Sequence, residues 1–482
     1  MKKRRTLKKI YSLLIIFFMI EIMFTGNSVQ AIEKKSENQI NLIVLFNDNN
    51  IDTDVENFVS ESGGKVVNKL ADIGGMEIYC DVELIPKIQD YATVKSIAPN
   101  HKINIKKGKA IDFKQLKSNK MSLNKVDDTS NDGDLYNLYQ WDIKRVTSNG
   151  KSFDLCSGNH DVVIGIVDSG IKKNHPDLEK NFMGGENFVS KNFDDDETET
   201  GDPKDIEDRF DHGTYVAGDI AANGRVKGVA PNIGFKSYRV FDSQGNTNAS
   251  IVSQAIIKAT NDGVNVINLS MTGYDLKGKC YWTDPKTGVK HNVGDDMAEY
   301  ELYKRAIKYA IKHNVTVVTA AGNDGINCSN TKKLTEFLNK QNGKDGFTYS
   351  GLTYVVPADI KGVINVSATG AGDKIASYSN YGNKFIDVAA PGGDSAVGQT
   401  VNDLCLSTAA NDTGYMFQEG TSIAAPKVSA IAGLILCKEP SLTPKEVAKR
   451  IYKTSDKLSG NKSSEYYGAG LANAYKALNS KK

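Results

Sequence analysis

Short apolar runs alternate with amphipathic segments over the last two-thirds of the chain. Four of these runs are rich in β-branched residues: VVIGIV at 162–167, VNVINLS at 264–270, VTVVTAA at 315–321 and GVINVSA at 362–368. Segments between them, such as 251–262 and 298–313, carry apolar residues at helical spacing. Continuous apolar strands separated by helices are typical of a parallel sheet covered on both faces. We therefore predict a doubly wound, mostly parallel α/β domain over residues 139–478.

A different pattern precedes this domain. Strands are predicted at 41–47 and 93–97, helices at 53–62 and 82–91, and two further strands within 64–80. This β-α-β-β-α-β order predicts a small ferredoxin-like domain over residues 38–104. Residues 105–138 are polar and rich in Lys, Ser, Asn and Asp, so we expect an exposed linker that contains a processing site.

The first residues have the pattern of a secretory signal peptide. Six basic residues within positions 2–9 precede an apolar run at 10–20, and small residues follow near Ala31. Glu21 ends the apolar run well before the roughly 20 residues needed to span a bilayer. We predict that residues 1–31 are a cleaved signal peptide and that the product is secreted and extracellular.

Composition narrows the possible classes of function. Lys and Arg number 60 and Asp and Glu 58, so the formal net charge of +2 does not favour a nucleic-acid partner. The six cysteines are scattered without metal-ligand spacing, which argues against a zinc site. We expect free, buried thiols; Cys280 with Cys328 is the pair considered for a disulfide, because each follows a predicted strand.

Four polar residues stand at ends of predicted strands or starts of predicted helices. Asp168 follows the first strand, His212 opens a helix of small residues, Asn323 lies between glycines after a strand, and Ser422 precedes an apolar helix. Each alone is more often a cap or turn residue. Their joint occurrence favours catalysis, because a doubly wound sheet builds its sites at the carboxyl ends of its strands.

The motifs around these residues resemble the signatures of the subtilisin-like serine proteases. They read VDSG at 167–170, HGTYVAG at 212–218, AAGNDG at 320–325 and GTSIAAP at 420–426, and the resemblance extends over roughly residues 140–475. It implies a serine endopeptidase with a covalent acyl-enzyme intermediate. A pseudoenzyme that only binds peptides would lack one of the catalytic residues, and this sequence has them all.

The resemblance also implies a role for each matching residue. Ser422 is the expected nucleophile, His212 its base and Asp168 the group that orients the imidazole, while Asn323 supplies the oxyanion hole. Substrate is expected to pair with the strand formed by Ser270, Met271 and Thr272. Thr272 stands where the family usually has glycine.

Further implications concern regulation and metals. Residues 38–104 match in position the family's propeptide, which acts as an intramolecular inhibitor of the zymogen. Asp177 matches a calcium ligand of the family, but the short segment after the His212 helix offers few oxygen ligands. We expect no cofactor, no tight calcium site there although calcium remains possible, and a monomer.

Two shorter segments resemble the lantibiotic leader peptidases: YQWDIKRV at 139–146 and TSIAAPKVS at 421–429. The resemblance implies that the enzyme removes the leader from a precursor peptide by cleavage after a basic residue. Insertions at 194–208 and 328–351 also favour such a dedicated maturation protease. The alternative is a broad-specificity extracellular protease.

Acidic residues suggest how a basic substrate residue would be recognised. Residues 194–208 contain nine Asp and Glu side chains, which form either a solvated loop or a field that attracts cationic substrate. Asp324, next to Asn323, is the expected direct contact to a guanidinium group.

Overall fold

The structure is a computed structural model. It describes residues 39–105, 110–112, 134–295, 297–398, 400–411, 414–460 and 463–480. Residues from Ile40 onward belong to one compact unit. The predicted signal peptide and most of the predicted linker lie outside the described residues, and the four predicted domain boundaries remain predictions.

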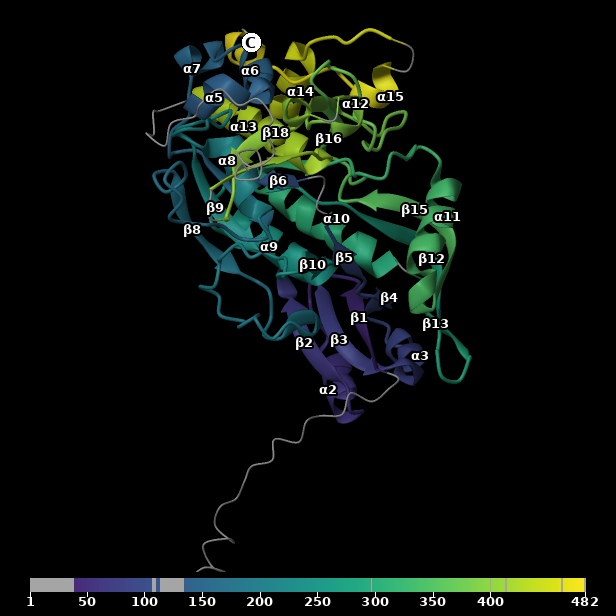
Figure 1. The fold of residues 1–482 in the computed structure, drawn as a ribbon. Helices are drawn as coiled ribbons and strands as arrows, with labels where there is room; N and C mark the ends of the chain where they lie inside the picture. Colours follow the sequence, from purple (N-terminus) through teal and green to yellow (C-terminus); the bar gives the residue numbers. More distant parts are fainter. Residues whose placement is uncertain are drawn as a thin grey trace, which may run out of the picture. The chain divides into compact units, whose positions relative to one another are not determined.

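A seven-stranded sheet forms the centre of the molecule, with the strand order β17-β16-β14-β11-β7-β9-β8 (Figure 1). All neighbouring strands in it are parallel. The strands are β7 (Val163–Asp168), β8 (Phe182–Asn187), β9 (Gly234–Arg239), β11 (Val266–Leu269), β14 (Thr316–Ala320), β16 (Ile364–Thr369) and β17 (Val388–Pro391). The predicted doubly wound α/β fold is confirmed.

Helices cover both faces of this sheet because alternate strand residues point to opposite sides. Ile164 and Ile166 of β7 pack into one apolar cluster, with α8 (Gly213–Ala221) and α13 (Thr421–Lys438). Val167 packs into another, with α9 (Ala249–Asn261) and α10 (Met297–Lys312). Helix α13 is long and apolar enough to cross a membrane, but 83% of it is buried within the protein. It is therefore a core helix.

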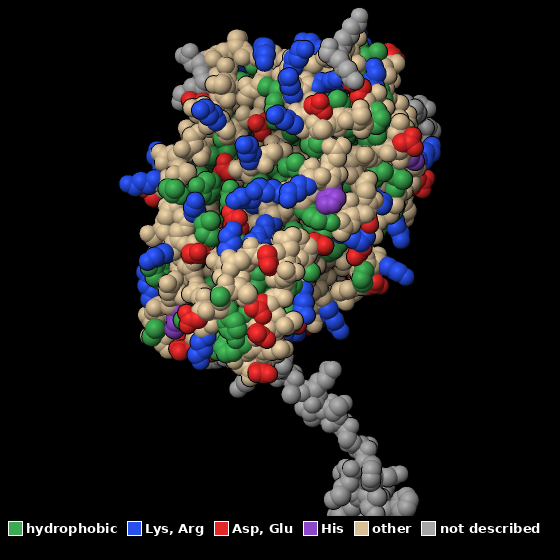
Figure 2. All heavy atoms as spheres, turned by 180° about the vertical axis from the view of Figure 1, so that it is seen from behind, with side chains coloured by type: hydrophobic (Ala, Val, Ile, Leu, Met, Phe, Trp, Pro, Cys, Tyr) green, Lys and Arg blue, Asp and Glu red, His purple; other side chains and the backbone are tan. Residues whose placement is uncertain are grey.

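Shorter helices lie beside α13 and at the periphery. Near the start of the large domain are α5 (Asp134–Tyr139), α6 (Trp141–Thr147) and α7 (Lys151–Leu155). Near the end of the chain are α12 (Ser395–Gly398), α14 (Pro444–Thr454), α15 (Ser463–Tyr467) and α16 (Ala474–Asn479). On the face seen in Figure 2, basic and acidic side chains lie interspersed, as the small net charge suggests.

The N-terminal segment forms a four-stranded sheet with the order β2-β3-β1-β4. Its elements are β1 (Gln39–Phe46), α2 (Thr53–Glu61), β2 (Lys65–Leu70), β3 (Gly75–Asp81), α3 (Ile85–Gln89) and β4 (Val94–Pro99). The expected β-α-β-β-α-β order is present. The second helix is shorter than predicted, because a 3-10 turn at Val82–Leu84 precedes it and Pro86 stands in its first turn.

An antiparallel sheet with the order β13-β12-β15 lies beside the central sheet. It consists of β12 (Gly273–Thr283), β13 (Lys290–Gly294) and β15 (Phe347–Val356), covered by α11 (Thr331–Asn342). The predicted insertion at 328–351 thus supplies α11 and the start of β15. Cys280 packs under the N-terminal sheet and Cys328 in a separate small cluster, so the Cys280–Cys328 disulfide is not formed and that candidate pair is wrong.

Two short strands follow the N-terminal sheet along the chain and pair with the large domain. Strand β5 (Lys102–Asn104) is antiparallel to β10 (Asn246–Asn248). Strand β6 (Ala110–Asp112) is antiparallel to β19 (Tyr415–Gln418), which also pairs with β18 (Cys405–Thr408). Strand β19 leads directly into the Gly420–Ser422 motif, so β6 lies beside the segment that carries the expected nucleophile.

Candidate active site

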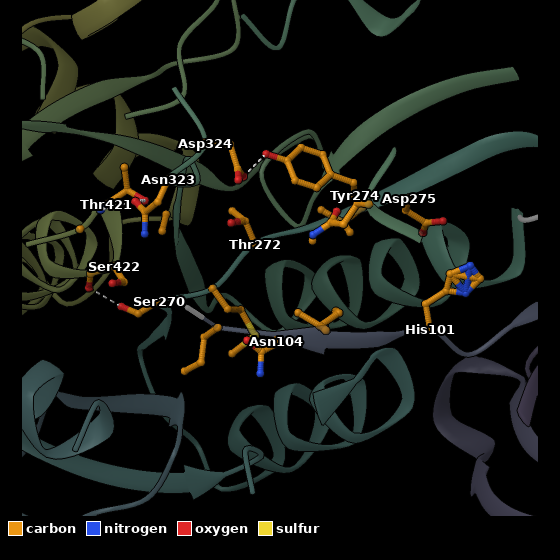
Figure 3. A pocket seen from close by; sticks show the side chains of 18 of the residues that line it. His101, Asn104, Ser270, Thr272, Tyr274, Asp275, Asn323, Asp324, Thr421 and Ser422 are labelled. Carbon is orange, nitrogen blue, oxygen red and sulfur yellow. Dashed lines mark hydrogen bonds between the residues drawn. The ribbon is translucent and has the colours of Figure 1, made fainter. Parts of the chain in front are cut away.

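A cleft of about 310 Å³ opens at the carboxyl ends of the central strands (Figure 3). Most of the residues predicted for the site line it: His212, Ser270, Met271, Thr272, Asn323, Asp324 and Ser422. Asp168 does not line the cleft but is bonded to His212. The structure therefore brings together every site residue predicted from the sequence.

Asp168 and His212 form a hydrogen-bonded pair. Asp168 ends β7 and is fully buried, and its Oδ1 accepts hydrogen bonds from His212 Nδ1 at 2.8 Å and from the Ser169 amide at 2.7 Å. His212 immediately precedes α8 and is 5% exposed. Because Nδ1 is held by the carboxylate, Nε2 is the ring nitrogen that can take a proton from a nucleophile.

Asp208 organises the loop that carries His212. Its Oδ1 accepts hydrogen bonds from Ser169 Oγ at 2.8 Å and from the Phe210 amide at 3.0 Å, and its Oδ2 accepts one from the Thr214 amide at 2.8 Å. Ser169 Oγ in turn accepts a hydrogen bond from the Gly213 amide at 2.8 Å. Sequence reasoning placed Asp208 among the residues that attract substrate, whereas its carboxylate fixes the start of α8.

Ser422 lies in the first turn of α13, where a proline changes the hydrogen bonding. Pro426 has no N–H, so it cannot satisfy the Ser422 carbonyl four residues earlier. Ser270 Oγ instead donates to that carbonyl at 2.8 Å (Figure 3), and Asn268 Nδ2 donates to Ser270 Oγ at 2.9 Å. Ser270, predicted only as part of the substrate strand, also holds the nucleophile's backbone.

Asn323 is oriented by the residue before the nucleophile. Its Oδ1 accepts hydrogen bonds from the Thr421 amide at 2.9 Å and from Thr421 Oγ1 at 2.8 Å, which directs Nδ2 elsewhere. A Cβ atom at Gly420 would lie 2.9 Å from Ser422 Oγ and 3.5 Å from Asn323 Nδ2. Both groups thus face one small space, which glycine leaves open for the oxyanion of a tetrahedral intermediate.

Asp324 stands half-buried on the wall of the cleft. Its Oδ2 accepts a hydrogen bond from Tyr274 Oη at 2.6 Å (Figure 3), and Asn380 Nδ2 donates to the same Tyr274 oxygen at 2.9 Å. Burial, together with the charge of Asp324, raises the pKa of Tyr274, so this hydroxyl remains a proton donor. Tyr274 and Asn380, which sequence reasoning missed, therefore hold the Asp324 carboxylate in place.

The acidic insertion at 194–208 is not simply a solvated, one-sign loop. Glu199 is buried and pairs with buried Arg239 at 2.6 Å, and Asp205 pairs with Arg209 at 2.9 Å. Only part of its nine charges can therefore act on a distant substrate. Asp194, another of the nine, lies 3.0 Å from Lys102 Nζ of β5 and so forms an ion pair with the N-terminal segment.

Residues 101–105 of the chain's own N-terminal segment line the cleft. In β5, Ile103 is opposite Thr247 of β10, and the Ile105 amide donates to the Gly245 carbonyl at 3.0 Å. Ile103 also packs so closely on Gly273 that a Cβ there would lie 3.3 Å from it. The segment adds a strand to the edge of the cleft, which is how proteins bind extended peptides.

Asp177, the possible calcium ligand, is bonded within the protein. Its carboxylate accepts hydrogen bonds from the Val226 amide at 2.9 Å and from Tyr415 Oη at 3.3 Å. Across the described ranges, no group of three or more His, Cys, Asp or Glu side chains is arranged to hold a metal ion. The expected lack of a tight calcium site stays a prediction.

Comparisons with known proteins agree with this geometry. The model of the subtilase family matches residues 159–470. The epidermin leader peptide-processing serine protease EpiP of Staphylococcus epidermidis is 34% identical over 83% of this chain and 88% of its own length. The nisin leader peptide-processing protease NisP of Lactococcus lactis is 36% identical over 67% of this chain, which spans 47% of that protein.

A solved structure is similar over nearly the whole of both chains. The crystal structure of the epidermin leader peptide-processing protease from Staphylococcus aureus has a TM-score of 0.74 and 31% identity, and the match covers 92% of this chain and 99% of that one. The family match covers well over half of the present chain. The chain therefore belongs to the subtilase family and is a serine protease.

Proposed function

We propose that this enzyme is exported and removes the leader from a lantibiotic precursor peptide, with Asp168, His212 and Ser422 as its catalytic triad. The observation that carries the catalytic assignment is that His212, hydrogen-bonded to buried Asp168, lines one cleft with Ser422 and Asn323, whose Oγ and Nδ2 face a common space. The choice of substrate is supported by the long match to proteases named for processing the epidermin and nisin leaders.

The geometry supports a complete acyl-transfer cycle. Ser422 Oγ attacks the scissile carbonyl while His212 Nε2 takes its proton, and Asp168 stabilises the resulting imidazolium. Asn323 Nδ2 and the Ser422 amide bind the oxyanion, and loss of such an Asn costs about 3 kcal/mol, as in subtilisin itself. His212 then protonates the leaving amine, and water releases the acyl group by the same steps in reverse.

The N-terminal domain serves as a propeptide inhibitor in this proposal. Its continuation, β5, pairs with β10 and lines the cleft, where it would keep a substrate out, and β6 pairs with the strand that leads to Ser422. Residues 106–109 (KKGK) connect β5 with β6; they lie outside the described residues. We place the self-processing cut between Ile105 and Ala110, a stretch that offers three lysines to an enzyme that cleaves after basic residues.

Mass spectrometry of the secreted protein tests this assignment. The wild-type chain is expected to yield a mature N-terminus between Ile105 and Ala110. The Ser422→Ala chain is expected to remain joined to residues 38–104, since the same nucleophile performs both reactions. Trimming of pure Ser422→Ala protein at that position would contradict self-processing, and a cut within 41–97 would contradict the domain assignment.

A further inference from the structure

Lys427 carries a fully buried positive charge on the helix that bears Ser422. Its Nζ lies 2.9 Å from Asp142 Oδ2 and 3.1 Å from Asp219 Oδ2, and it donates to the Ile423 carbonyl at 2.9 Å. Asp142 and Asp219 are also fully buried. These three charged side chains lie outside the lining of the cleft, so the acyl-transfer cycle gives them no direct part.

The three side chains come from three different helices (Figure 1). Lys427 follows Ser422 by little more than one turn of α13, and Asp219 follows His212 by about two turns of α8. Asp142 stands in the first turn of α6. One ammonium group therefore connects the helix of the nucleophile with the helix that begins at the general base.

Strand β18 also holds α8 in place. A Cβ at Gly218 would lie 2.3 Å from Ser407 Oγ and 2.3 Å from Thr408 Oγ1, so α8 and β18 touch at a position that admits only glycine. Ser407 Oγ donates to the Tyr215 carbonyl at 2.9 Å, and Thr408 Oγ1 donates to the Thr214 carbonyl at 2.7 Å. Helix α8 is thus held by β18 as well as by Lys427.

The buried charges of Lys427, Asp142 and Asp219 are not explained by a contribution to folding stability. Burying an ion pair costs desolvation, and apolar residues of similar volume often stabilise a core as well or better. Here two carboxylates share a single cation, and burial raises the pKa of Asp219 to about 7, with a contribution from the charge of Asp142. A buried cluster of this kind does, however, fix the relative position of its elements, because each displaced charge loses its partner.

We propose that Lys427, with Asp142 and Asp219 as its partners, is a positioning residue of the active site. It sets the separation of α8 and α13, and with it the reach of the Ser422 hydroxyl to the His212 imidazole. Because Asp142 follows shortly after the predicted linker, the proposal also requires that the N-terminus of the active enzyme lie before Asp142.

The test compares Lys427→Met with a control that removes another ionic contact of α6. In Arg145→Met the contacts to Asp373 at 3.0 Å and to Asp456 at 2.7 Å are lost, while neither α8 nor α13 is touched. Both variants are made as the full chain, and kcat and KM for a peptide substrate are measured with the rate of inactivation by a fluorophosphonate. Thermal unfolding reports the stability of each.

For Lys427→Met we expect kcat and the inactivation rate to fall at least tenfold, with KM within threefold of wild type. For Arg145→Met we expect a lower Tm and a kcat within twofold of wild type. Folded Lys427→Met protein with a kcat within twofold would overturn the proposal, as would an effect on KM alone or equal losses of kcat in both variants.

A milder variant keeps the test decisive if Lys427→Met does not fold. Asp219→Asn preserves the shape of the side chain and leaves the Lys427–Asp142 contact in place. We expect it to fold and to lose at least threefold in kcat with little change in KM. An unchanged kcat in folded Asp219→Asn protein would contradict the positioning role.

Discussion

Asp324 is the residue on which basic specificity depends in the proposed function. It lies beside Asn323 on the cleft wall, where Tyr274 Oη donates a hydrogen bond to its carboxylate. A guanidinium group can bind a carboxylate with two parallel hydrogen bonds, and the gain is larger where water is partly excluded. Asp324 is half-buried, which provides such an environment.

Substitution of Asp324 should therefore change the choice of substrate more than the chemistry. The test uses peptides that differ only in the residue before the cut bond. We expect Asp324→Asn to lower kcat/KM at least tenfold for the peptide with Arg there and to leave kcat/KM nearly unchanged for the peptide with Leu. Glu419→Gln is the matched control, since Glu419 also lines the cleft but accepts its hydrogen bonds from Ser395. An intact preference for Arg in Asp324→Asn would remove Asp324 from specificity.

At the residue scale, the sequence predicts the reacting residues better than the contacts that hold them in place. Ser422, His212 and Asn323 stand in motifs of residues adjacent in the chain, so the resemblance of these motifs to the family's signatures is enough to identify them. The supporting roles of Ser270 and Lys427 were missed because their partners are distant: Ser270 contacts the backbone of a residue 152 positions away, and Lys427 pairs with an aspartate 208 positions away. A lysine in an apolar helix is a signal for such a partner.

At the element scale, strand β5 is the part of the propeptide segment that enters the cleft, and His101 directly precedes it. His101 Nε2 bonds to Tyr349 Oη at 2.6 Å, and its ring packs 5.0 Å from that of Phe347. Burial lowers the pKa of His101 from 6.5 to about 4. Glu299 lies 4.0 Å from Nδ1, at the limit of an ion pair, and does not offset the lost hydration.

Acid should therefore loosen this strand. Because the pKa of the docked imidazole lies below its unfolded value, docking is fully stabilised above about pH 6.5 and loses stability as the pH falls toward 4. We expect His101 to weaken docking roughly 20-fold between pH 7 and pH 5. Hydrogen exchange of β5 amides in Ser422→Ala protein, corrected for intrinsic rates, measures this. His101→Phe protein should lack the effect; equal pH dependence in both would refute it.

The strands of the central sheet that the apolar pattern predicts are also found at this scale. The apolar runs became β7, β11, β14 and β16 within one or two residues at each end. Strand β8 carries two glycines and few apolar residues, and the long strands β12 and β15 lie partly exposed in a sheet of their own. Such strands have no continuous apolar run, so their place depends on pairing partners that the sequence does not reveal.

At the scale of the whole molecule, a subtilase fold carries additional elements around its cleft. The family and the doubly wound sheet follow from four local motifs and from apolar periodicity, and both are confirmed. The insertion at 328–351 supplies α11 and the start of β15 of the accessory sheet β13-β12-β15, and Leu338 and Gln341 of α11 line the cleft. Additional side chains that line the cleft exclude substrates that do not fit them, which favours a narrow substrate range over the digestion of many proteins.

Digestion of a lantibiotic precursor peptide tests the central claim most directly. The precursor is incubated with wild-type and with Ser422→Ala enzyme, and all products are identified by mass spectrometry over time. We expect one early cut, after a basic residue at the junction of leader and core, by wild-type enzyme alone. Early cuts at many bonds, or the same cut by Ser422→Ala protein, would contradict it.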